Sequence, residues 1–71
     1  MTVGEPLWKL TKDSHTAEAR VRAIDGIGVE LRLVWNGELW ASQVYRVATE
    51  LEAAAEEKRV ELEGRGWVVV A

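Results

Sequence analysis

The chain has 71 residues, no cysteine, four tryptophans and a formal net charge of −3. A chain of this length holds one domain near the lower size limit for a self-sufficient core, and the lack of cysteine excludes disulfides and cysteine-based metal sites. No apolar stretch approaches the roughly 20 residues of a membrane span and the start has no signal-peptide pattern, so we expect a cytoplasmic protein.

Alternating apolar and polar residues predict four strands, after a flexible N-terminal arm over residues 1–6. Residues 7–71 are expected to form a single α+β domain. The strands have turn residues between them at Asp13-Ser14, Asp25-Gly26 and Asn36-Gly37. They read LWKLTK (7–12), TAEARVRAI (16–24), GVELRLVW (28–35) and ELWASQVYR (38–46).

The Asn36-Gly37 pair favours a two-residue type I′ hairpin loop, because both positions then have positive φ. Strict alternation from this loop places Trp35 and Trp40 on one face, toward the core. It places Gln43 and Tyr45 on the opposite, outer face. The pairs expected are Trp35–Glu38, Leu33–Trp40, Leu31–Ser42 and Val29–Val44.

A three-residue loop, Asp25-Gly26-Ile27, sets the register of the preceding hairpin, because a two-residue loop would bury arginines. A column of alanines in the second strand then leaves a shallow trough where a helix can approach closely. The expected pairs are Ala23–Val29, Val21–Leu31, Ala19–Leu33, Ala17–Trp35, Trp8–Ala19 and Leu10–Ala17.

Residues 49–66, TELEAAAEEKRVELEGRG, predict the helix, with Thr49 as N-cap and Glu52 completing a capping box. Gly64 or Gly66 would end it. The stripe facing the sheet consists of Leu51, Ala54, Ala55, Lys58 and Leu62. The predicted fold is thus a four-stranded antiparallel meander with one helix packed on one face, plus a short C-terminal strand in WVVVA (67–71). That strand either joins residues 7–12 or pairs with another subunit.

Candidate catalytic chemistry is sparse. His15, the single histidine, falls in a turn beside Ser14 and is read as exposed. The acidic residues of the helix are read as a solvated face, with Arg59 and Arg65 at partner spacing to Glu56 and Glu61. These acids are Glu50, Glu52, Glu56, Glu57, Glu61 and Glu63. The sequence predicts no catalytic residue, no metal site and no cofactor.

The outer sheet face is the most informative feature, because it mixes charges with apolar residues. Its register predicts an Arg22–Glu30 ion pair and places Arg20 opposite Arg32, an unfavourable arrangement unless Glu18 or an anion lies between them. The candidate binding residues are Arg20, Arg22, Arg32, Gln43 and Tyr45. They fit a protein interface, or single-stranded nucleic acid held by phosphate contacts and stacking. A plain solvated lattice of Glu18–Arg32 and Arg22–Glu30 pairs is a third interpretation.

Residues 7–67 resemble small bacterial proteins of a sheet-plus-helix type, a family that implies no activity. The stretches that carry this resemblance are ELR (30–32), NGEL (36–39), SQVYR (42–46), KR (58–59) and GW (66–67). The tail, with Lys58 and Gly66-Trp67, is also similar to that of WGR domains, which are DNA-associated. The defining Trp-Gly-Arg stretch is missing, so no DNA-binding residue is carried over.

The small core and semi-apolar face favour a non-enzymatic protein-interaction or accessory module, expected to be a homodimer. The acidic total charge disfavours the alternative, nucleic-acid binding. A second candidate surface for association is the apolar C-terminal edge, comprising Trp67, Val68, Val69 and Val70.

Overall fold

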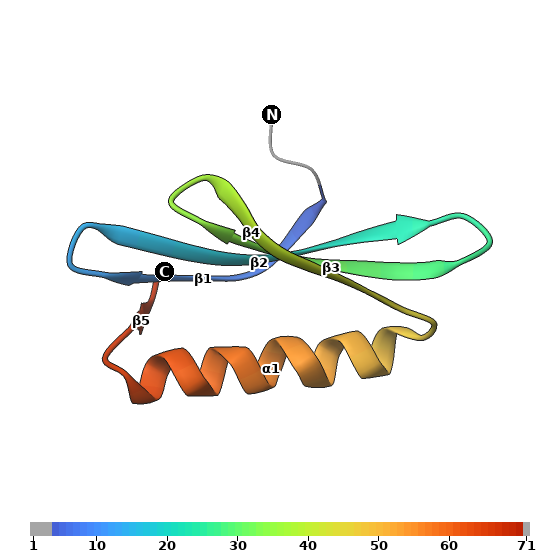
Figure 1. Ribbon diagram of the computed structural model, residues 1–71. Helices are drawn as coiled ribbons and strands as arrows, with labels where there is room; N and C mark the ends of the chain where they lie inside the picture. The colour runs from blue at the N-terminus through green and yellow to red at the C-terminus, as the bar shows by residue number, and fades with distance from the viewer. Residues whose placement is uncertain (1–3, 71) are drawn as a thin grey trace.

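The computed structural model describes residues 4–70, and in this part of the chain one helix packs on one face of an antiparallel sheet (Figure 1). The strand order is β4-β3-β2-β1-β5. The predicted α+β meander with a short C-terminal strand is confirmed. The elements are β1 Glu5–Lys12, β2 His15–Ile24, β3 Gly28–Trp35, β4 Glu38–Tyr45, α1 Ala48–Gly64 and β5 Val68–Val69.

Part of the predicted N-terminal arm belongs to the sheet. β1 begins at Glu5, which pairs with Val21, and the Gly4 carbonyl accepts a hydrogen bond from Arg20. The arm prediction over residues 1–6 therefore does not hold for residues 5 and 6. Residues 1–3 of that arm, and residue 71 of the predicted C-terminal strand, lie outside the described residues.

The registers of the first two hairpins are confirmed. Trp8 pairs with Ala19 and Leu10 with Ala17, while all predicted β2–β3 pairs from Ala17–Trp35 to Ala23–Val29 are present. At the third turn Asn36 and Gly37 have φ values of 50° and 84°, as a type I′ loop requires. Local turn chemistry and alternation were therefore sufficient to align β1, β2 and β3.

The predicted register of β3 with β4 is wrong beyond the turn. Trp35 pairs with Glu38, but Leu33 pairs with Ala41 and Val29 with Tyr45, because the ladder shifts by one residue between Leu33 and Val34. Trp40 is the extra residue of this β-bulge. Trp40 and Tyr45 are an odd number of positions apart, so regular alternation would send the two rings to opposite faces. The bulge lets both lie on the helix side.

The core lies between α1 and the centre of the sheet. The alanines predicted to form a trough are buried at Ala17 and Ala19, and α1 contributes Leu51, Ala55 and Leu62. Trp8 also donates an indole hydrogen bond to the Ala55 carbonyl at 3.1 Å. Small residues in mid-sheet therefore allow the close helix approach that the sequence predicted, and the predicted stripe of α1 faces the sheet.

The predicted capping box is absent. The residue that precedes α1 is Val47, which has extended geometry and makes no side-chain capping bond. The helix begins at Ala48, so Thr49 lies inside its first turn and its hydroxyl does not cap the helix. The strand before the helix, β4, ends at Tyr45, which leaves only two residues before α1.

We expect Val47→Asp to raise the free energy of unfolding by about 0.5–1 kcal/mol. An aspartate at this position can accept from a free backbone N–H of the first turn and is favoured by the positive end of the helix dipole. Urea denaturation followed by circular dichroism measures the change. Thr49→Ala is the control and should be nearly neutral, whereas a loss of about 1 kcal/mol would show that Thr49 caps the helix after all.

Candidate interaction surface

The three arginines predicted as binding residues lie on the sheet face opposite α1, and they are engaged in ion pairs. Glu18 lies 2.7 Å from Arg20, and Glu30 lies 2.9 Å from Arg22 and 3.2 Å from Arg32. Glu30 is buried, and only Arg22 of the three arginines has a largely exposed side chain. The predicted Arg22–Glu30 pair is confirmed, while the expected Glu18–Arg32 pair is replaced by Glu18–Arg20 and Glu30–Arg32.

These pairs explain how Arg20 can stand opposite Arg32 in the ladder. Each guanidinium has an acid two residues away on its own strand, and residues two apart in a strand share a face. Opposite charges at that spacing offset the repulsion between the arginines. This part of the outer face is therefore a lattice of ion pairs, of the kind that the third interpretation of the sequence anticipated, although one of its two expected pairs differs.

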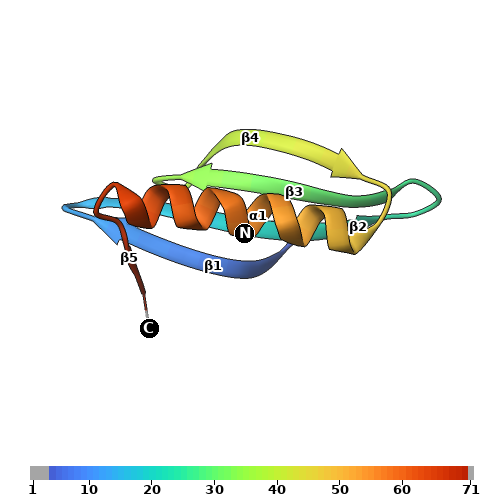
Figure 2. The ribbon, with the colours of Figure 1, turned by 90° about the horizontal axis from the view of Figure 1, so that it is seen from below.

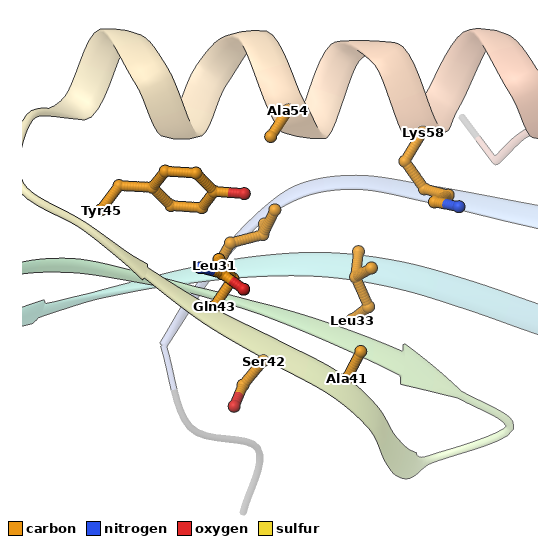
Figure 3. Close-up of a pocket in the computed structure, with 8 residues that line it drawn as sticks. All are labelled: Leu31, Leu33, Ala41, Ser42, Gln43, Tyr45, Ala54 and Lys58. Atoms are coloured by element: carbon orange, nitrogen blue, oxygen red, sulfur yellow. The ribbon is translucent and has the colours of Figure 1, made fainter.

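The other two predicted binding residues, Gln43 and Tyr45, do not share a face with the arginines. The bulge in β4 places them with Leu31 on the helix side, and Figure 3 shows the Tyr45 ring between the sheet and α1. Tyr45 packs against the buried cluster that contains Leu31 and Leu51. The placement of Gln43 and Tyr45 on the outer face was thus wrong, and the five residues do not form one surface.

Instead, Gln43 and Tyr45 line a groove between α1 and β4 (Figure 3). The groove has a volume of about 280 Å³ and a mainly apolar lining. Its helix side is formed by Ala54 and Lys58. The remaining lining residues are Leu31, Leu33, Ala41 and Ser42, and Ser42 points away from the helix.

A cluster of tryptophans continues from this groove. Trp35 makes edge contacts with Trp40, at 5.6 Å between ring centroids, and with Trp67, at 4.9 Å. The Lys58 ammonium lies 5.4 Å from the Trp40 ring centroid, in a cation–π arrangement. The prediction that Trp35 and Trp40 lie on the helix side is therefore confirmed, but Trp40 remains 50% exposed.

β4 is one edge of the sheet, and α1 leaves it uncovered (Figure 2). Every β4 residue except Tyr45 is exposed, among them Leu39, Trp40 and Val44. Residues 39–45 carry no charge. Natural edge strands are commonly blunted by charged residues, proline or very short length. In β4 only the bulge provides such protection.

The C-terminal edge is organised differently from β4. β5 pairs within the chain, with Val68 opposite Thr11 and Val69 opposite Leu10, which settles the alternative left open by the sequence. Trp67 is 6% exposed and belongs to the core, so its place on an association edge was wrong. Val68, Val69 and Val70 are exposed, but β5 has only two residues and is a short edge in the described part of the chain.

Three acids of α1, Glu56, Glu61 and Glu63, are paired with bases on or next to the same helix. A hydrogen bond from Arg59 lowers the pKa of Glu56, and one from Lys58 lowers the pKa of Glu61. Arg65 also lies 3.3 Å from Glu61, which confirms the predicted partner spacing. Within residues 4–70 no group of three or more acidic or histidine side chains is arranged to hold a metal ion.

His15, at the start of β2, is exposed as expected. Its ring nitrogen lies 3.0 Å from the side-chain amide nitrogen of Asn36. Asn36 also accepts a hydrogen bond from the Thr16 backbone N–H. His15 therefore contributes to the contact between two neighbouring turns.

Comparisons of the chain with protein-family models, with curated proteins and with solved structures find no match. The resemblances noted from the sequence stay predictions. Among residues 4–70, no helix has the length and apolar character needed to cross a membrane.

Proposed function

We propose that this chain is a non-enzymatic protein-interaction module that self-associates through the free edge of β4. The observation that carries the proposal is the character of this edge: eight residues long, uncharged from residue 39 to residue 45, with exposed Leu39, Trp40 and Val44. Tryptophan is enriched among the residues that anchor protein interfaces, and Leu39 and Val44 extend the exposed apolar surface around Trp40.

The physical reason lies in the backbone of an edge strand. Part of its N–H and C=O groups point away from the sheet, and another strand can bind them with a regular ladder of hydrogen bonds. β4 offers such a ladder beside apolar side chains, whereas β5 offers two residues. The C-terminal edge, one of the two surfaces that the sequence predicted for association, is thus weaker than the edge of β4, which we propose in its place.

The alternative, single-stranded nucleic-acid binding, requires arginines and an aromatic ring on one open face. Tyr45 lies on the helix side, and Arg20 and Arg32 are paired with acids. No observation favours this function, and we do not propose it.

Val44→Lys should weaken self-association by about tenfold or more, because it places a charge in the apolar edge. Sedimentation equilibrium over a wide concentration range measures the effect. Val60→Lys is the matched control, because Val60 is also about half exposed but lies on α1. The wild type and Val60→Lys should sediment as dimers at concentrations where Val44→Lys is monomeric. A wild type that stays monomeric throughout would overturn the proposal.

A further inference from the structure

We infer that two copies of β4 pair antiparallel about a two-fold axis at Ser42, so that one continuous sheet with five strands from each copy results. This inference rests on the proposed self-association and specifies its partner, a second copy of this chain, and its register. Two observations support it: the opposite charges at the two ends of β4, and the face of the sheet on which each β4 side chain lies.

The charges at the ends of β4 are complementary in an antiparallel dimer. Glu38 begins the strand and Arg46 follows its end, each four residues from Ser42. Both are exposed, and within residues 4–70 neither forms an ion pair. Antiparallel pairing about Ser42 brings Glu38 of each copy within one residue of Arg46 of the other, because the bulge at Trp40 shifts the ladder between them. Parallel pairing would bring Glu38 beside Glu38, which is unfavourable.

The faces also agree in this register. Ala41 and Gln43 lie on the helix side and Ser42 on the outer side. Pairing about Ser42 places Ala41 opposite Gln43 of the second copy, so directly opposite residues share a face, as a β ladder requires. Beyond Ala41 the bulge at Trp40 shifts the ladder by one residue, so that Leu39 lies opposite Val44 on the outer side and Glu38 lies opposite Tyr45 on the helix side. Arg46 of the second copy is the next residue after Tyr45.

The position of α1 leaves room for the second copy. The helix lies over the centre of the sheet, so the free edge of β4 is unobstructed (Figure 2). A two-fold axis perpendicular to the sheet puts both helices on the same face. The two grooves between α1 and β4 then open toward each other, with β4 of both copies as a common floor. Trp40 of each copy gains neighbours there and loses exposure.

Charge exchange tests the register directly. Glu38→Arg and Arg46→Glu, each alone, should weaken dimerisation by about tenfold, because each places like charges side by side twice in a symmetric dimer. An equimolar mixture of the two variants should form a heterodimer, in which both contacts are again complementary. The double variant Glu38→Arg/Arg46→Glu should recover homodimerisation. Glu57→Arg, on the exposed face of α1, is the charge control.

Because the chain has no cysteine, a disulfide provides a second readout. Directly opposite residues in an antiparallel pair have Cα atoms about 4.5–5.5 Å apart, within the range that a disulfide spans. Ser42→Cys should therefore form a covalent dimer under mild oxidation. Val68→Cys, which reports on the β5 edge, and Val60→Cys, on α1, should remain monomeric on a non-reducing gel.

The outcomes separate the inference from the proposed function. A dimeric wild type whose mass is unchanged by Glu38→Arg and Arg46→Glu overturns the register but leaves self-association standing. Preferential cross-linking of Val68→Cys would likewise overturn the register and leave self-association standing, and it would place the interface at β5. A monomeric wild type overturns both. Rescue in the mixture together with cross-linking at Ser42→Cys supports the arrangement.

Discussion

Trp67→Ala is expected to lower the free energy of unfolding by about 3–5 kcal/mol, the usual cost of removing a large buried ring. The indole is 6% exposed and packs with Leu10 and Leu62, while its ring makes an edge contact with Trp35. A domain of this size has a total stability on the order of 4–10 kcal/mol, so the variant should retain little folded structure at room temperature. Urea denaturation followed by circular dichroism measures the loss.

Two controls isolate the contribution of the ring. Val68→Ala changes the next residue, which is exposed and in β5, and should shift stability by no more than about 0.5 kcal/mol. Trp67→Phe keeps an aromatic ring and should cost less than Trp67→Ala. If Trp67→Ala is as mild as Val68→Ala, the indole lies on the surface, as the sequence alone suggested, and its assignment to the core is wrong.

Gly28→Ala should destabilise the fold by about 3 kcal/mol or more, because two unfavourable effects combine there. Gly28 has a φ of 152°, and a Cβ atom at this position would lie 2.1 Å from the Tyr45 carbonyl oxygen. The obstructing atom is backbone, so relief requires β3 and the end of β4 to move apart. Because Tyr45 lines the groove beside α1, the surface next to the free edge should change as well.

Gly26→Ala, in the turn just before β3, separates backbone strain from steric overlap. Gly26 has a φ of 74°, but a Cβ atom there meets nothing within 4 Å. Its cost should be about 1 kcal/mol, that of a left-handed non-glycine residue. Thermal unfolding of the two variants gives the comparison. Equal losses would show that Gly28 matters only for its φ and that Tyr45 does not approach it closely.

The candidate interaction surface was only partly predictable. Exposed apolar residues at an uncharged edge are visible in the sequence as Leu39, Trp40 and Val44, but strand order was needed to show that β4 is open along its length. The five-residue separation of Trp40 and Tyr45 was the available signal for a bulge. Because strict alternation without a bulge was assumed, Gln43 and Tyr45 were assigned to the outer face, and the groove between α1 and β4 was missed.

By itself, the sequence determined the strands, the turns, the registers of β1 with β2 and β2 with β3, and the stripe of α1 that faces the sheet. The turns and registers depend on contacts between residues that are close in the chain. The strands and the helix stripe follow from the spacing of apolar residues, which recur every second residue in a strand and every three to four residues in a helix. Tertiary packing decided the bulge at Trp40, the pairing of β5 with β1, the burial of Trp67 and the first residue of α1. In each case the free energy of placing a large ring or a short segment against a distant element outweighs a local preference that is worth only about 1 kcal/mol.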